Sequence, residues 1–239
     1  GHKELFKGLA MEQLEQDWFE YPVFHIDFNN ADFTEAGKLA SVLKGYVTSW
    51  ERIYGKSPDF EDIGNRFAYV LEQAHKQTGR RAVVLIDEYD KPLLDVLDSG
   101  LRIQQNGKEI LLEEQHRNIL KGFYSVFKGA DAHLKFVLLT GVTKFSQVSV
   151  FSGFNQPADI SMVEDFEALC GITTEELLTV FAEPIQELAQ KWNITEDEVE
   201  NKLKRQYDGY HFSENLLGVY NPFSLLNCFR YKKMTDYWF

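Results

Sequence analysis

An uninterrupted apolar run at residues 82–86, Ala-Val-Val-Leu-Ile, constrains the fold more than any other feature of this 239-residue chain. Such a run, without polar alternation, is typical of a strand that helices cover on both faces of a parallel sheet. A second run at residues 136–139 follows a long helical stretch that ends at residues 118–128. Because parallel strands need a crossover connection, the order strand, helix, strand predicts an α/β domain with a mostly parallel sheet.

The segments around these runs fit the same architecture. Residues 22–28 alternate apolar and polar side chains and end at two asparagines, which predicts a strand followed by a turn. The other predicted elements are a short amphipathic helix at residues 3–15, helices at residues 34–54 and 60–77, and an exposed loop at residues 99–109.

The last third of the chain changes to helical patterns. Residues 173–176 and 195–198 both match the S/T-x-x-E capping box, in which a hydroxyl and a carboxyl close the first turn of a helix. We therefore expect an α/β core at residues 1–170, followed by a helical appendage at residues 171–239.

Composition and charge exclude several classes of function. The 37 acidic and 25 basic residues give a formal net charge of -12, which opposes direct binding to the phosphates of nucleic acids. No stretch approaches the roughly 18 apolar residues that a membrane-spanning helix needs, so we expect a cytoplasmic protein without membrane contact. The two cysteines, Cys170 and Cys228, are too few for a disulfide framework or a zinc site, and we expect both to be buried, reduced thiols.

No nucleophile or metal motif is recognisable elsewhere in the sequence. The chain has no GxSxG motif, and neither cysteine lies in the setting of a catalytic thiol. The histidines at positions 25, 75, 116, 133 and 211 show neither an HExxH motif nor a pair at the spacing of metal ligands. We interpret them as structural or surface residues.

Two adjacent carboxylates, Asp87 and Glu88, follow the first apolar run directly. Ligands of open α/β sheets bind beyond the carboxyl ends of the strands, where these residues are expected. Carboxylate oxygens suit Mg²⁺, so Asp87 could hold the hydration shell of the ion that accompanies ATP. Glu88 could then orient and deprotonate the attacking water. The alternative is that both residues only cap the segment after the strand.

The second apolar run ends in Thr140 and Gly141, with Lys144 soon after. Polar groups in this position could contact a terminal phosphate or the attacking water, and Thr140 and Lys144 are our candidates for that role. The alternative is a polar loop whose hydroxyl groups cap a helix.

Four motifs, taken together and in this order, are more specific than any one of them alone. The motifs are ELFKGL at residues 4–9, VLIDEYDKPL at residues 84–93, LTGVTKFS at residues 139–146 and YDGYHF at residues 207–212, with YNPFS at residues 220–224 after them. With these motifs the chain strongly resembles the AAA-ATPase-like family common in gut bacteria and other anaerobes, and the resemblance extends over nearly the whole sequence.

The resemblance implies a three-layer α/β/α core of the P-loop NTPase type that binds and hydrolyses ATP with Mg²⁺. Asp87 and Glu88 match the Walker B carboxylates of the family, and residues 140–144 occupy the sensor position. The helices after residue 171 resemble the ATPase lid. Many family members also carry a C-terminal PD-(D/E)xK nuclease-like domain.

The sequence departs from the family because no GxxxxGK[ST] loop precedes the strand at residues 22–28. Without the amides and the lysine of that loop, little remains to cradle the β- and γ-phosphates. We therefore expect that this chain alone binds neither ATP nor Mg²⁺ tightly and is inactive. The first strand of the family's sheet would also be missing, which leaves an edge that could pair with another molecule, including a second copy.

Two other classes of function compete with the ATPase. In one, a degenerate ATPase fold serves as a non-catalytic scaffold for protein partners. In the other, the chain is a nuclease whose metal ion is held by Asp87, Glu88 and Asp90. The acidic composition disfavours this alternative, because a negatively charged chain repels nucleic acid. A glycine-lysine loop upstream in a longer protein would favour the enzyme over the scaffold.

Overall fold

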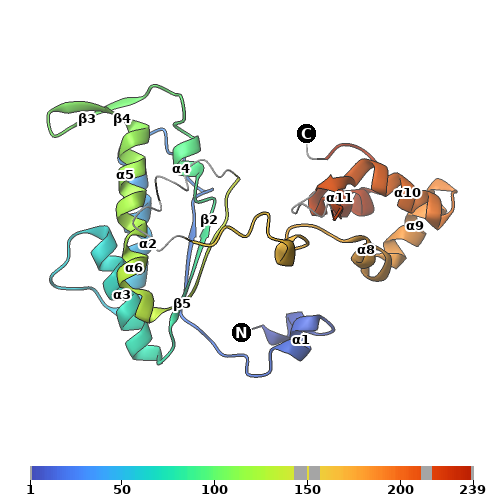
Figure 1. Ribbon diagram of the computed structural model, residues 1–239, viewed down its shortest axis with the longest axis horizontal. Coiled ribbons are helices and arrows are strands. Elements are labelled where there is room, and N and C mark those ends of the chain that lie inside the picture. Colours follow the sequence, from blue (N-terminus) through green and yellow to red (C-terminus); the bar gives the residue numbers. More distant parts are fainter. Residues whose placement is uncertain (1, 143–149, 151–156, 211–216, 238–239) are drawn as a thin grey trace. The chain divides into compact units, whose positions relative to one another are not determined.

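The structure, a computed structural model, describes residues 2–142, 150, 157–210 and 217–237. The chain divides into two compact units, Gly1–Pro157 and Ala158–Phe239 (Figure 1). The first unit contains a parallel sheet with helices, which confirms the α/β class. The second unit begins before the helical pattern of the sequence does, with a segment that includes the 3-10 helix η3 at Glu164–Phe166.

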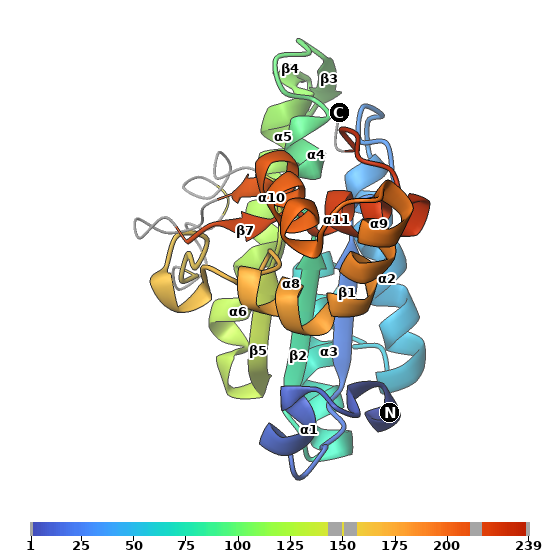
Figure 2. The same ribbon diagram turned by 90° about the vertical axis from the view of Figure 1, so that its right-hand side faces the viewer.

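Three parallel strands form the sheet of the first unit, in the order β1 (Val23–Asp27), β2 (Ala82–Asp87) and β5 (Leu134–Leu139) (Figure 2). The sequence predicts all three strands, and β5 begins slightly earlier than expected. Because β2 lies in the middle and pairs in register with β1, Asp27 and Asp87 are neighbours at the ends of their strands. The carboxyl ends of the strands therefore meet at one edge of the sheet.

The helices that cover this sheet lie on one of its sides (Figure 1). Phe67 and Phe123, from two of these helices, stack with ring centroids 5.2 Å apart. On the opposite face, Val23 and Phe136 are 53% and 52% exposed, so the described residues of this unit do not cover the sheet on both faces as predicted. The helices are α2 (Lys38–Tyr54), α3 (Ile63–Thr78), α5 (Leu112–Tyr124) and α6 (Val126–Gly129).

Capping residues fix the ends of the two longest helices. Gly37 precedes α2 with a left-handed φ of 78°, and the Asp62 carboxylate accepts the amide hydrogen of Asn65 at the start of α3. Gly79 ends α3 with a left-handed φ of 66°. Both predicted helices are confirmed, and these caps explain why they begin later than the apolar pattern indicated.

A buried ion pair joins α2 to α3. Glu51 and Arg66 are only 7% and 6% exposed, and Arg66 donates from Nε to Oε1 over 2.8 Å and from Nη2 to Oε2 over 2.6 Å. The same Nη2 also donates to the Thr48 hydroxyl over 3.2 Å. The hydrogen bonds from Arg66 hold the pKa of Glu51 below its ordinary value. The two helices are therefore linked by a charge pair with little contact to solvent.

Two predictions about local structure in this unit are wrong. Residues 99–109 were expected to form a loop, but β3 (Arg102–Gln105) and β4 (Lys108–Leu111) pair there as an antiparallel hairpin. Its turn residues, Asn106 and Gly107, both have positive φ, at 53° and 75°, which is the conformation that Asn-Gly favours in tight hairpins. The expected helix at residues 3–15 is instead two short pieces, η1 (Lys3–Phe6) and α1 (Ala10–Leu14).

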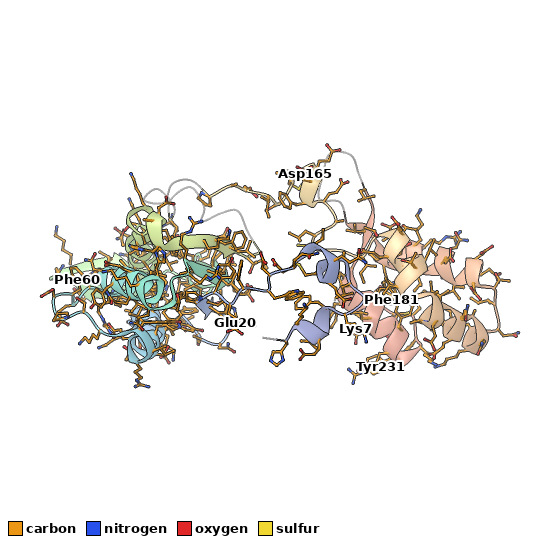
Figure 3. All side chains as sticks on the ribbon, turned by 90° about the horizontal axis from the view of Figure 1, so that it is seen from below. Lys7, Glu20, Phe60, Asp165, Phe181 and Tyr231 are labelled. Atoms are coloured by element: carbon orange, nitrogen blue, oxygen red, sulfur yellow. The ribbon has the colours of Figure 1, made fainter. Side chains whose placement is uncertain are left out.

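The second unit is a small helical assembly. Both predicted capping boxes are confirmed, because Thr173 and Thr195 exchange hydrogen bonds with Glu176 and Glu198. Phe181, which is labelled in Figure 3, stacks on Phe229 with ring centroids 5.5 Å apart. The elements are α8 (Thr174–Val180), α9 (Ala182–Trp192), α10 (Glu196–Tyr207), β6 (Asp208–Tyr210), β7 (Val219–Tyr220) and α11 (Pro222–Tyr231).

The two cysteines of this unit differ in exposure. Cys228 of α11 is buried as predicted, but Cys170 is exposed, which contradicts its predicted place in the core. Cys170 lies in a turn between η3 and α8 rather than in an apolar helix face. Within the part of the chain that the structure describes, no helix is long and apolar enough to cross a membrane.

Candidate functional site

The chain turns sharply after β2. Asp87 is the exposed last residue of the strand, and Glu88 follows with a left-handed φ of 54°, an uncommon conformation for a residue other than glycine. The Asp87 carboxylate accepts the amide hydrogen of Glu88 over 3.1 Å. The short helix α4 (Lys91–Leu94) begins soon afterwards. The structure therefore has two adjacent carboxylates at the carboxyl edge of the sheet, where the sequence predicted them.

Hydrogen bonds join the end of β5 to this turn. The hydroxyl of Thr140 donates to Oδ1 of Asp87. The Thr140 amide donates to the carbonyl of Ile86 over 2.9 Å, and the Thr140 carbonyl accepts from the amide of Tyr89 over 2.9 Å. The candidate residues Asp87, Glu88 and Thr140 are thus brought together. Lys144, the remaining candidate, lies outside the described residues.

Asp90 and Gly141 form a second link between the same two segments. Asp90 is 1% exposed, and its carboxylate accepts the amide hydrogen of Val142 over 3.1 Å at Oδ2 and 3.4 Å at Oδ1. A Cβ atom on Gly141 would lie 2.6 Å from Asp90 Oδ1 and 2.6 Å from Tyr89 Cε1, closer than atoms pack. Glycine is therefore required here by the close approach of the two segments, which the sequence pattern alone did not reveal.

The edge of the sheet is strongly acidic around Glu88. Partial burial raises the pKa of the Glu88 carboxyl above its ordinary value, and neighbouring carboxylates raise it further. These neighbours are, in decreasing order of effect, Asp90, Asp87 and Asp27. Together with Glu88 they form what we call the acidic edge of the sheet. Asp27 accepts the amide hydrogen of Asn29 over 2.7 Å, so its own carboxylate is fixed in the turn after β1. Sequence reasoning missed Asp27, and only the in-register pairing of β1 with β2 could have found it.

The chain matches a protein family through the segment that contains this site. The family model described as Predicted AAA-ATPase matches residues 1–151. The chain belongs to this family. The matched residues include the turn after β2 and the end of β5, which the hydrogen bond between Thr140 and Asp87 joins. The family match therefore covers the site described above.

One curated relative of this AAA-ATPase-like chain is an uncharacterized protein in the vnfD 5′ region of Azotobacter chroococcum mcd 1. It is 35% identical over 240 residues, which cover 100% of this chain but 42% of the relative. The chain therefore spans less than half the length of that relative. No solved structure matches the chain.

The acidic edge fits the way in which proteins hold Mg²⁺ beside a nucleotide. Among the described residues, no three His, Cys, Asp or Glu side chains form a group that could hold a metal ion by itself. Mg²⁺ in nucleotide sites is bound by one or two carboxylates together with water and substrate phosphates, so a complete protein cage is not required. Asp87 and Glu88 are suitable oxygen ligands of this kind. The sequence has no GxxxxGK[ST] motif to hold the phosphates themselves.

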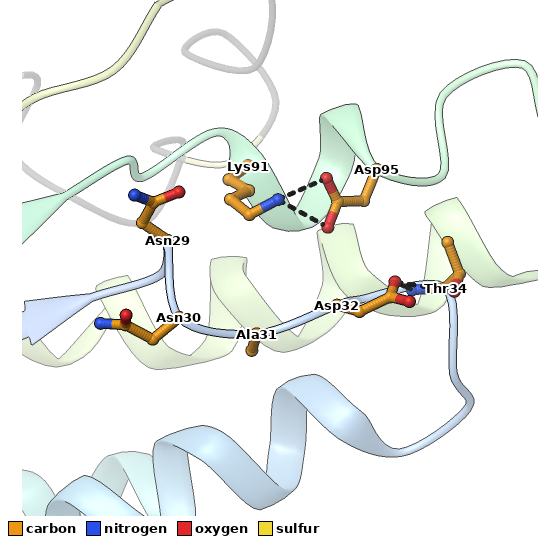
Figure 4. A pocket seen from close by; sticks show the side chains of 7 residues that line it. All are labelled: Asn29, Asn30, Ala31, Asp32, Thr34, Lys91 and Asp95. Atoms are coloured by element: carbon orange, nitrogen blue, oxygen red, sulfur yellow. Dashed lines mark hydrogen bonds and ion pairs between the residues drawn. The ribbon is translucent and has the colours of Figure 1, made fainter.

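An open polar hollow lies beside the ends of β1 and β2 (Figure 4). Lys91 of α4 reaches into it, but both carboxylate oxygens of Asp95 accept hydrogen bonds from its ammonium group, over 2.8 Å and 3.0 Å. The lysine charge is therefore compensated within the hollow. The lining residues are Asn29, Asn30, Ala31, Asp32, Thr34, Lys91 and Asp95.

Proposed function

We propose that this chain is the part of an ATP-hydrolysing domain that binds Mg²⁺ and activates water. The hydrogen bond from Thr140 to Asp87, with Glu88 as the next residue, is the observation that supports this best. It links polar groups from two adjacent parallel strands at the edge of the sheet where ligands of α/β proteins bind. The proposed parent protein would share the family's three-layer P-loop NTPase core.

The proposed roles follow from the chemistry of each side chain. Asp87 would hold Mg²⁺, which when bound neutralises the charge that develops on the phosphates during transfer. Glu88 would accept the proton of the attacking water, and a raised pKa brings a carboxylate closer to the range in which a general base works best. Thr140 would keep Asp87 in position while it senses the terminal phosphate, together with Lys144.

The proposal also assigns roles to the helical second unit and to a phosphate loop outside this chain. The helical second unit would act as the lid of the ATPase, and the protein would work in the cytoplasm without binding nucleic acid directly. A phosphate loop from a longer protein would complete the site, so this chain alone would not turn over ATP. These statements rest on the family resemblance and on the acidic charge of the chain.

We also propose that the free edge of β5 is a place of self-association. In the described sheet β5 pairs only with β2, so its other edge carries backbone groups that a further strand can pair with. Light scattering of this chain would test the proposal. A dimeric mass supports it, whereas a monomeric mass at micromolar concentration contradicts it.

The proposed reaction is tested by Mg²⁺-dependent ATP turnover. A longer protein that contains this chain and its upstream residues would be compared with this chain alone and with a Glu88→Gln variant of the longer protein. Glu35→Gln is the matched control, because Glu35 is exposed and follows a different strand. We expect turnover in the longer wild type and in the control variant only. Neither turnover nor nucleotide binding in the longer wild type would contradict the ATPase and favour a non-catalytic scaffold.

A further inference from the structure

Two histidines that lie far apart in the sequence face each other in the first unit. The Nδ1 atoms of His75 and His133 are 3.0 Å apart, a hydrogen bond in which one ring donates its proton to the lone pair of the other. The ring centroids are 5.3 Å apart and the ring planes make an angle of 69°. His75 belongs to the last turn of α3, and His133 ends η2 (Asp131–His133), directly before β5. Both side chains are half buried.

The distance between these nitrogen atoms is that of two ligands on one metal ion. Zinc–imidazole bonds of about 2.0–2.1 Å that meet at about 90–110° separate the two nitrogens by about 2.9–3.4 Å. The observed 3.0 Å lies within this range. A divalent ion can therefore replace the shared proton if the two rings rotate slightly so that their lone pairs converge beside the line that joins them.

The surroundings favour a cation at this point. The carbonyl end of a helix carries partial negative charge, and His75 lies in the last turn of α3. Glu72 lies one helical turn before His75 on the same face of α3. The hydrogen bond of its ion pair with Lys76 is the main cause of the lowered pKa of the Glu72 carboxyl, and His133 makes a smaller contribution in the same direction.

We propose that His75 and His133 form a binding site for a borderline divalent transition-metal ion such as Zn²⁺ or Ni²⁺. Imidazole nitrogen suits these ions and does not suit Mg²⁺, so this site is distinct from the acidic edge where Asp87 lies. Since no group of three metal-binding side chains occurs among the residues that the structure describes, water completes the coordination. The bound ion links the end of α3 to the segment before β5.

Thermal unfolding of this chain with the metal salts alone tests the proposal. At pH 7.5 we expect Zn²⁺ and Ni²⁺ to raise the Tm of the wild type in a concentration-dependent way, because an ion that binds the folded state stabilises it. Mg²⁺ at the same concentration should not. His75→Asn and His133→Asn should each remove the increase, whereas His25→Asn, which changes an exposed histidine of β1, should retain it. No increase in the wild type, or an increase that both site variants retain, would overturn the proposal.

A spectroscopic measurement keeps the proposal testable if the Asn variants fail to fold. Cu²⁺ binds the same class of nitrogen ligand, and its electron paramagnetic resonance spectrum shows coupling to each coordinated imidazole nitrogen. In a chain with His2→Asn and His25→Asn, we expect one bound Cu²⁺ coupled to two nitrogen atoms. A spectrum of hydrated Cu²⁺, or of copper with a single nitrogen ligand, would show that the two rings do not form a site together.

Discussion

The Thr140 hydroxyl donates a hydrogen bond to Asp87 Oδ1, and this bond joins the ends of two strands that lie side by side in the sheet. A carboxylate held in this way has fewer accessible orientations than one on an unsupported loop. The backbone bond between Tyr89 and Thr140 maintains the same spacing between the two segments. The orientation of Asp87 therefore depends on β5 as well as on its own strand, and this dependence can be tested.

Replacement of Thr140 by Val should slow ATP turnover in a longer protein that contains the complete site. A hydrogen bond to a charged group contributes about 1.5–3 kcal/mol, so its loss corresponds to a decrease in kcat of roughly tenfold to hundredfold. Thr140→Ser retains the hydroxyl and should keep most of the activity. Thr179→Val is the control, because the Thr179 hydroxyl only donates to a backbone carbonyl of its own helix α8. Equal kcat values for Thr140→Val and the wild type would refute this role.

Replacement of Gly141 by Ala should destabilise the first unit. The new methyl group would lie 2.6 Å from both Asp90 Oδ1 and Tyr89 Cε1, so the segment after β5 must move away from the turn after β2. Overpacking of this kind costs about 1–3 kcal/mol, which urea unfolding measures as a lower midpoint.

Gly45→Ala provides the matched control for that experiment. Gly45 lies inside α2, and a Cβ atom there would meet nothing within 4 Å. Alanine is the better helix former, so this variant should be more stable by about 0.5–1 kcal/mol. If both glycine variants shifted the midpoint in the same direction and by the same amount, the close contact at Gly141 would not explain the effect.

The sequence predicted the strands of the sheet because each is a local pattern. The apolar runs that became β2 and β5, and the alternating run that became β1, can each be recognised without knowledge of the rest of the fold. Asp87 and Glu88 were identified for the same reason, since they directly follow one of these runs. The hairpin of β3 and β4 was missed because its Asn-Gly turn was interpreted as a sign of a loop, although Asn-Gly also favours a tight hairpin.

Features that depend on contacts between distant segments could not be predicted in this way. Asp27 contributes to the acidic edge only because β1 pairs in register with β2. Gly141 is required only because Asp90 and Tyr89 approach it from another segment. His75 and His133 were interpreted as isolated residues because the bond between their rings is set by the packing of η2 against α3.

Loss of either partner of the Glu51–Arg66 ion pair should destabilise the protein strongly. Removal of one charge leaves the other buried without a partner, which costs about 3–5 kcal/mol, so Arg66→Ala should unfold at a much lower urea concentration. Arg102→Ala is the control, because Arg102 and Glu109 form a pair at 3.5 Å with both side chains 55% exposed. Exposed pairs contribute about 0–1 kcal/mol, so this variant should remain close to the wild type. Equal destabilisation by the two substitutions would contradict a special role for the buried pair.

His116 should make the stability of the protein depend on pH near neutrality. Its ring is fully buried, and burial lowers the pKa of the imidazole below its ordinary value. Nδ1 donates to the carbonyl of Pro92 over 2.8 Å, and Nε2 has no hydrogen-bond partner among the described residues. Protonation of Nε2 would therefore create a buried positive charge, and the new N–H group would have no acceptor. Both effects oppose protonation of His116 in the folded state.

The direction of this dependence follows from the two pKa values. In the unfolded chain the imidazole of His116 has a pKa of about 6.5, whereas the folded chain binds the proton only at lower pH. The contribution to the free energy of unfolding is therefore complete above the unfolded pKa and is lost as the pH falls toward the folded pKa, with a slope of at most about 1.4 kcal/mol per pH unit. Urea unfolding at pH 7.5 and pH 5.5 should show a larger loss for the wild type and for His25→Gln than for His116→Gln. If the loss were the same in all three proteins, titration of His116 would not be its cause.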